Sequence, residues 1–295
     1  MASTAIKRIL KERIHYNKNP LNKEGIYIDF SDDNIFNAKV LIIGPENTPY
    51  ENGFYLFNFD FPKSYPHKPP KGKFYTIDGK IRMNPNLYEE GYICLSLLGT
   101  WPGPSWSSSQ TLNSICMSIR ALVLNDNPIQ NEPSFEKEVG IRAQKYKNII
   151  EHENLRIAVC KMLKNTPNGF ECFKPQMEKY FVENYDWYIK NAIKNMKKNG
   201  KADKSPIYNM NIVYKYKELQ DTMESIGKGL GVIPKKFEII PPPKTKKKKY
   251  TRKAPKAPSK MYDLGFQMVS ENDGKMYVVS QNKNGVKRWK KVKTN

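Results

Sequence analysis

The chain of 295 residues lacks long apolar runs and has few cysteines, and both shortages exclude classes of protein. No stretch approaches the ~18 consecutive apolar residues of a membrane span. The first residues contain no long apolar segment of the kind found in secretory signals. The four cysteines are too sparse for a disulfide scaffold. We therefore expect an intracellular protein, cytoplasmic or nuclear or both, with reduced thiols and no membrane contact.

Acidic residues are also scarce, and the excess of positive charge is concentrated near the end of the chain. Against 50 Lys and Arg stand 29 Asp and Glu, so the formal net charge is +21. From Lys235 to Asn295 there are 18 basic and four acidic residues, which makes +14 of that total. Such a balance indicates acidic partners, for example nucleic acid, an anionic membrane surface or an acidic protein.

The basic segment itself has two parts. Prolines and lysines dominate residues 235–260, where like charges repel and prolines cannot join a helix or a central strand, so we expect a disordered linker. Residues 261–295 contain short β-prone runs separated by Asn272-Asp273-Gly274 and Asn284-Gly285, which are turn signals. This pattern predicts a small β-meander module.

The body of the chain has the pattern of an α+β fold. Residues 3–16 place Ile6, Ile9, Leu10 and Ile14 at helical spacing, which predicts an N-terminal helix with a basic outer face. Strand-like runs over 26–30, 37–43, 53–61 and 72–77 predict a four-stranded antiparallel meander. A long loop follows over 78–105, and then helices are expected over 109–124, 138–164, 170–198 and, more weakly, 211–226.

The loop contains the pattern that indicates chemistry. Asn84-Pro85-Asn86 forms a polar turn eight residues before the lone Cys94, with Gly91 between them. A thiol can carry an acyl group as a thioester. A side-chain amide can donate to the oxygen that becomes negative when such a thioester is attacked. By itself, a cysteine between apolar residues is more often a packing residue, and Cys116 and Cys160 on apolar helix faces are interpreted in that way.

The segment NPNLYEEGYICLSLLGTW resembles the active-site segment of ubiquitin-conjugating enzymes. In order along the chain, GPENTPYENGFYLFNFDFP, SYPHKPP, LNSICMSIRALVLNDNP and NEP resemble further segments of that family. The resemblance covers residues 3–160, and the LSLLGTW and NEP segments are similar to those of its large subclass with conjugating and ligase-like behaviour. It implies a conjugating core over 1–165, followed by a helical extension over 166–234.

The resemblance also implies roles for single residues. Cys94 would accept ubiquitin as a thioester from the activating enzyme, and a substrate lysine would then attack that thioester. This role leads us to expect that the sulfur of Cys94 is open to solvent. Asn86 would stabilise the oxyanion or order the neighbouring loop. Asn84 stands where most members have a histidine that is thought to be structural, so activity should survive this difference. The acid that helps to deprotonate the lysine would be either Asp126 or Glu132.

Docking surfaces are implied in the same way. The basic face of the first helix, with Lys7, Arg8 and Lys11, would contact the activating enzyme or is a plain solvated surface. Two loops would meet a ligase, and their residues here are Pro62, His67, Trp106 and Ser107. Many members have a large apolar residue at the position of His67, so ligase choice is expected to differ. Trp101 and Trp106 are interpreted as supports of the loop.

Three other functions compete with this interpretation. The first is an inert scaffold of the same fold, although such relatives usually lack the cysteine. The second is a cysteine hydrolase, which needs a histidine beside the thiol, and His15, His67 and His152 all lie outside the loop. The third is a nucleic-acid binder acting through residues 244–256. We expect no metal and no cofactor, because a separate activating enzyme would consume the ATP.

Overall fold

The computed structural model describes residues 2–232 and 254–292, and it divides the chain into two compact units. The first unit is Met1–Lys236 and the second is Phe237–Asn295. The expected core and helical extension therefore belong to one unit. Most of the predicted linker, including 235–253, lies outside the described residues.

An antiparallel sheet of four strands forms the centre of the first unit. The strands are β1 (Ile26–Phe30), β2 (Asn37–Ile43), β3 (Phe54–Asp60) and β4 (Lys71–Phe74), in that order across the sheet. Val40 of β2 lies opposite Ile28 on one side and Phe57 on the other, so apolar side chains form continuous rows. The predicted α+β class and meander are confirmed, and β1 and β2 have the predicted bounds. The predicted fourth strand extends too far, because pairing with β3 ends at Phe74.

The first helix, α1 (Ala2–Lys18), buries Ile9 as predicted, but the rest of its buried face differs from the predicted one. Ala5, Ile9, Glu12 and Tyr16 are buried, whereas Leu10 is 40% and Ile14 54% exposed. Buried Glu12 explains the difference, because its carboxylate accepts hydrogen bonds from the Tyr65 hydroxyl (2.6 Å) and the Leu112 backbone (2.9 Å). Contacts with other segments therefore determine which face of α1 is buried, and hydrophobic spacing within the helix is not sufficient to predict it.

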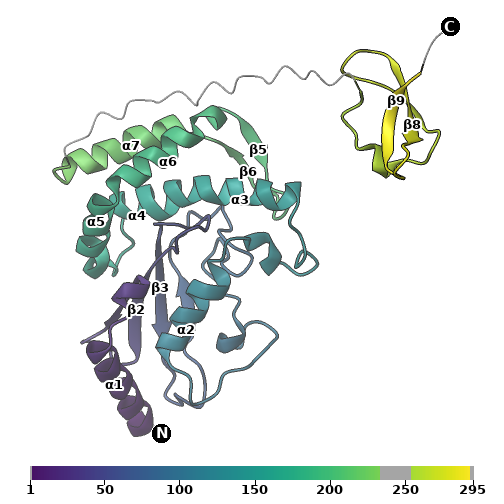
Figure 1. The fold of residues 1–295 in the computed structure, drawn as a ribbon. Coiled ribbons are helices and arrows are strands. Elements are labelled where there is room, and N and C mark those ends of the chain that lie inside the picture. Colours follow the sequence, from purple (N-terminus) through teal and green to yellow (C-terminus); the bar gives the residue numbers. More distant parts are fainter. Residues whose placement is uncertain (1, 233–253, 293–295) are drawn as a thin grey trace. The chain divides into compact units, whose positions relative to one another are not determined.

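The next helix begins later than predicted and changes its geometry. Thr111 and Ser114 form a capping box, so α2 spans Leu112–Ser118, and a π-helical segment continues over Ile119–Val123. In Figure 1, α1 and the helices after residue 141 lie at opposite ends of the sheet.

The later helices are α3 (Ile141–Glu153), α4 (Met162–Lys164), α5 (Lys174–Glu183), α6 (Tyr185–Asn195) and α7 (Tyr216–Gly229), with a π-helical segment over Asn154–Lys161. A hairpin of β5 (Ala202–Lys204) and β6 (Asn211–Val213) precedes α7. The prediction of helix at 211–213 is therefore wrong, because these residues pair with β5. Among the described helices, none is long and apolar enough to span a membrane.

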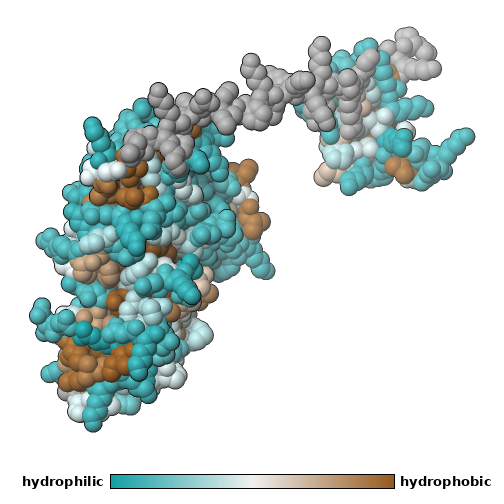
Figure 2. Space-filling model, turned by 60° about the vertical axis from the view of Figure 1, so that its left-hand side comes forward, coloured by the Kyte–Doolittle hydropathy of each residue, from teal (hydrophilic) through white to brown (hydrophobic). Residues whose placement is uncertain are grey.

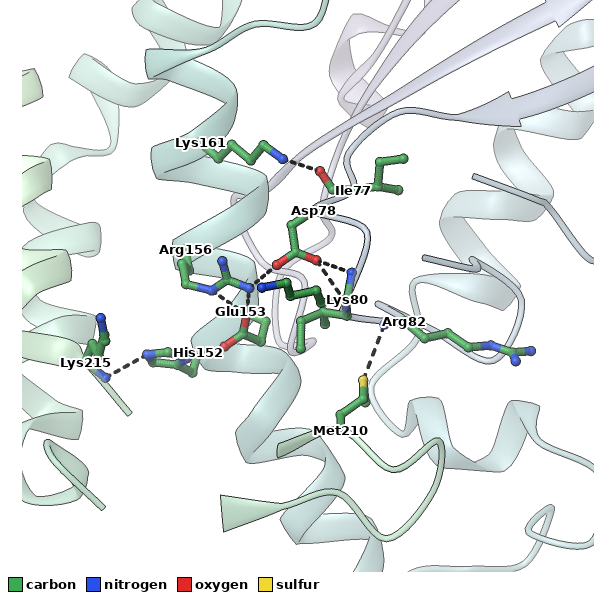
Figure 3. Close-up of polar contacts among 11 residues, drawn as sticks. Ile77, Asp78, Lys80, Arg82, His152, Glu153, Arg156, Lys161, Met210 and Lys215 are labelled. Atoms are coloured by element: carbon green, nitrogen blue, oxygen red, sulfur yellow. Dashed lines mark hydrogen bonds and ion pairs between the residues drawn. The ribbon is translucent and has the colours of Figure 1, made fainter. Parts of the chain in front are cut away.

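The helical extension is joined to the core by buried polar contacts. The Tyr188 hydroxyl of the extension donates to the carbonyl oxygen of Asn52 (2.6 Å), and the Tyr180 hydroxyl donates to the Asn52 side chain (2.8 Å). Figure 3 shows the bond from the Lys215 backbone of the extension to His152, beside the ion pairs that Arg156 makes within the core with Asp78 and Glu153. The surface drawn in Figure 2 is mostly hydrophilic, with hydrophobic side chains in separate patches.

The second unit is a three-stranded antiparallel sheet of β7 (Gln267–Val269), β8 (Met276–Gln281) and β9 (Lys287–Lys291). Both predicted turns are present, with Gly274 and Gly285 at φ of 68° and 78°, values that favour glycine. The Trp289 side chain donates to the carbonyl oxygen of Ala257 (2.6 Å). This contact ties residues before 261 to the module, whereas their proline and lysine content predicts a linker.

Candidate functional site

The loop after β4 brings Asn86 and Cys94 together. The Cys94 backbone N–H donates to the Asn86 carbonyl oxygen (2.9 Å), and the Asn86 side-chain amide donates to the Cys94 carbonyl oxygen (2.8 Å). Gly91 makes the return possible, since its φ is 98° and an added Cβ would lie 2.6 Å from the carbonyl oxygen of Phe74. The amide is thus at the cysteine, and in this structure it orders the loop.

Cys94 itself is only 4% exposed, which corrects the expectation of a thiol open to solvent. The residue nevertheless lines a cavity of about 320 Å³. Around it stand the side chains of Asn86, Leu95, Ser96, Trp101, Leu122, Val123, Gln130, Asn131, Glu132, Pro133 and Glu136. Cys94 therefore forms part of the wall of a recess, so its low exposure does not by itself remove it from chemistry.

An aromatic residue, Tyr88, contacts the Cys94 thiol, and a cationic residue, Arg82, packs on Tyr88. The Cys94 thiol donates to the Tyr88 hydroxyl, with 3.7 Å between Sγ and Oη. The Arg82 guanidinium lies over the Tyr88 ring, 3.4 Å from its centroid. Burial, together with the contact to the thiol, raises the pKa of Tyr88, so its hydroxyl stays protonated at neutral pH.

Asn84 has a structural environment. It is fully buried, and its amide donates to the Tyr50 hydroxyl and to the Val123 carbonyl oxygen, both at 2.7 Å. Its oxygen accepts from the Asn86 backbone (2.8 Å) and from the Asn131 side chain (3.3 Å). Asn84 therefore connects the turn before the cysteine to the segment that follows α2.

The two candidate acids are separated by the tertiary structure. Glu132 lines the cavity of Cys94, whereas Asp126 is exposed and is not among the lining residues. The Glu132 carboxylate accepts a hydrogen bond from the Tyr208 hydroxyl. Sequence reasoning missed Tyr208, because nothing in the sequence relates a residue of the β5–β6 turn to the loop at 132. It also missed Glu136, and it treated Trp101 as a support although that side chain lines the cavity.

The predicted ligase loops lie together. The Trp106 indole donates to the carbonyl oxygen of Pro66 (2.6 Å), and its ring centroid is 5.8 Å from that of Tyr65. Trp106 thus supports the proline-rich loop at Tyr65 and Pro66, whereas the prediction had it support the loop of Cys94. His67 and Ser107 are exposed, while Pro62 and Trp106 are half-buried.

The basic face of α1 is smaller than predicted. Lys7 and Lys11 are exposed, but the Arg8 guanidinium pairs with Glu12 and donates to the carbonyl oxygen of Gln110, both at 2.6 Å. Arg8 is therefore a structural residue in this arrangement, and the available charge of this face comes from the two lysines.

The remaining cysteines and the histidines lie away from the cavity. Cys116 and Cys160 are buried, which confirms their interpretation as packing residues, and burial raises the pKa of Cys160 to about 12. Cys172 is exposed. None of the histidines lines the cavity of Cys94, so a hydrolase lacks its base here. In the part of the chain that the structure describes, no cluster of three or more His, Cys, Asp or Glu could hold a metal.

Comparisons with known proteins agree on one family. The family model described as "Ubiquitin-conjugating enzyme" matches residues 8–150. The chain is 40% identical over 189 residues to "Ubiquitin-conjugating enzyme E2 Z" of Xenopus tropicalis, an alignment that covers 63% of this chain and 59% of the relative. It is 46% identical over 150 residues to the Homo sapiens protein of that name, covering 50% of this chain and 42% of the relative. "Probable ubiquitin-conjugating enzyme protein 17" of Caenorhabditis elegans is 38% identical over 198 residues, which cover 63% of this chain and 26% of the relative. The chain thus matches about half the length of its E2 Z relatives.

Proposed function

Because this chain belongs to the ubiquitin-conjugating enzyme family, we propose that it carries ubiquitin on Cys94 and transfers it to a substrate lysine. The observation that carries the proposal is the pairing of Cys94 with Asn86 at the edge of a cavity. An acyl carrier needs a thiol with room beside it and an amide within reach, and this loop supplies both.

The first step is a thioester exchange. The Cys94 thiolate attacks the carbonyl carbon of the ubiquitin C-terminal glycine on the activating enzyme, a new C–S bond forms, the old C–S bond breaks, and the cysteine of the activating enzyme leaves as a thiolate. In the second step, a lysine amine attacks the same carbon. The C–N bond forms, the C–S bond breaks, and Cys94 leaves as a thiolate. The amine proton needs an acceptor, and Glu132 is the candidate acid that lines the cavity.

Asn86 has two ways to assist. Its amide holds the carbonyl oxygen of Cys94 and so fixes the loop that presents the sulfur. The same NH₂ group has a second hydrogen, which can donate to the oxyanion formed during attack. Loss of one such donor costs about 3–4 kcal/mol in comparable acyl-transfer sites.

The partners follow from this chemistry. We propose ubiquitin, an activating enzyme, a ligase and lysine-bearing substrates as partners, with Lys7 and Lys11 facing the activating enzyme. The loops of His67 and Ser107 are the proposed ligase surface, since both residues are exposed. A nucleic-acid contact through 244–256 stays a prediction, and most of that segment lies outside the described residues.

A gel assay tests the proposal directly. The full chain is incubated with activating enzyme, ATP and either ubiquitin or a related modifier, and products are separated with and without reductant. We expect an adduct that reductant removes, that Cys94→Ala abolishes and that Cys172→Ala leaves unchanged. Cys172 is the matched control, because it is an exposed cysteine outside the cavity. An adduct that forms without Cys94, or no adduct with any modifier, would contradict the proposal and favour an inert scaffold.

A further inference from the structure

Tyr208 comes from the helical extension, yet its hydroxyl contacts Glu132, a residue that lines the cavity of Cys94. It lies in the turn between β5 and β6, and both it and Asn209 have left-handed backbone conformations, with φ of 62° and 51°. A bulky residue in this region costs of order 1 kcal/mol or more, so the surroundings must hold it there. The turn is closed by the Ser205 backbone N–H, which donates to the carbonyl oxygen of Met210 (2.8 Å).

The turn is fixed to the core beside this residue. The Arg82 backbone N–H donates to the Met210 sulfur (3.3 Å), as Figure 3 shows. In the same region, Arg156 pairs with Asp78 and Glu153, and the Lys215 backbone donates to His152 at 2.9 Å. The Met210 contact thus attaches the β5–β6 hairpin to the segment that leads into the active-site loop, and the Lys215 bond fixes the chain just after the hairpin.

Two side-chain contacts connect Tyr208 to the site. Its hydroxyl donates to the Glu132 carboxylate, which lines the cavity of Cys94. Its ring lies over the Arg82 guanidinium, 4.1 Å from the centroid, and Arg82 also lies over the Tyr88 ring. The Tyr88 hydroxyl accepts from the thiol. One residue of the extension therefore contacts the candidate base directly and the thiol through two intermediates.

We propose that Tyr208 is a positioning residue for the transfer step, holding the Glu132 carboxylate where it can accept the proton of the incoming lysine. This role rests on the proposed function. The hydroxyl occupies one carboxylate oxygen, and the second oxygen takes the proton from the amine nitrogen as the C–N bond forms and the bond to Cys94 breaks.

If Tyr208 positions the base, its loss should slow discharge to nucleophiles that must lose a proton and should not affect nucleophiles that are already unprotonated. Lysine is mostly protonated at neutral pH and must lose a proton, whereas hydroxylamine is already unprotonated. After loading is stopped, discharge of the thioester is measured with each nucleophile. We expect Tyr208→Phe to slow discharge to lysine about 10-fold and to leave discharge to hydroxylamine unchanged. The variant keeps the ring over Arg82, so the fold is retained, and its melting temperature checks this.

Tyr214→Phe is the matched control. Tyr214 follows the same hairpin and donates to a carboxylate, Asp203 (3.0 Å), but neither residue lines the cavity. The thioester on the Tyr214→Phe variant should discharge to lysine at the same rate as the thioester on the unaltered chain. In a Glu132→Gln background, Tyr208→Phe should add little, because residues that act as one unit are not additive.

Each possible result either supports or overturns the positioning role of Tyr208. Lysine discharge at the unaltered rate in Tyr208→Phe, equal slowing with both nucleophiles, or full additivity with Glu132→Gln would overturn the positioning role while the proposed function stands. If the unaltered chain forms no thioester, the proposed function fails, and this role fails with it.

Discussion

Replacing Asn84 with alanine should destabilise the fold strongly. The side chain is fully buried and makes four hydrogen bonds, and three of them are 2.7–2.8 Å long. Each such bond contributes about 1 kcal/mol net, and a buried group that loses its partner costs about 1–3 kcal/mol.

The environment limits the loss. After the substitution, the Tyr50 hydroxyl still donates to the carbonyl oxygen of Met83 (3.1 Å), and the Val123 carbonyl still accepts from Asn131 at 3.3 Å. The Asn86 backbone N–H loses the acceptor that Asn84 provides. Three lost bonds at about 1 kcal/mol each and one orphaned donor at about 1–3 kcal/mol together suggest about 4–6 kcal/mol of lost stability.

Urea unfolding followed by circular dichroism measures this loss through the transition midpoint. Asn19→Ala is the control, because that exposed amide makes a single local bond of 3.3 Å, and its substitution should change the free energy of unfolding by less than ~0.5 kcal/mol. A loss below ~1 kcal/mol for Asn84→Ala would show that the buried network is worth far less than its geometry implies.

Three further predictions concern catalysis, pH and the second unit. Asn86→Ala should load ubiquitin but discharge it to lysine about 100-fold more slowly, measured by single-turnover gels, and unchanged discharge would remove its role. Burial opposes ionisation of Asp78, but hydrogen bonds from Arg156 and from backbone N–H groups hold its pKa below the ordinary value. The stability that this carboxylate contributes is therefore present above pH ~4 and is lost as the pH falls through its lower folded-state pKa; thermal melts should show a smaller loss over that range for Arg156→Met. Removal of residues 237–295 should leave thioester loading and the urea midpoint of the first unit unchanged, since they form a separate unit, and lost loading would refute this independence.

The extension contributes to the site as well as to the fold. Its helices pack on the conjugating core through tyrosine hydroxyls, and its hairpin supplies Tyr208 to Glu132. A chain that ended at residue 165, the predicted end of the core, would lose both contributions. For the proposed function, we therefore expect that the residues needed for transfer extend beyond 165 and include the β5–β6 hairpin.

Several elements could be predicted from residue patterns because those patterns are local. Alternating apolar residues gave β1 and β2 their bounds, turn signals located the meander of the second unit, and the segment around Cys94 indicated thioester chemistry. These features depend on neighbours within a few residues, where spacing and backbone preference decide the conformation.

Other features depend on distant partners, and only the folded chain brings those partners together. Residues 211–213 form a strand only because they pair with β5, and α1 buries Glu12 only because Tyr65 and the start of α2 supply its hydrogen bonds. The choice between Asp126 and Glu132 follows from which one reaches the cavity. Such contacts join segments far apart along the chain, and their loop-closure cost is repaid only by the packing of the whole unit.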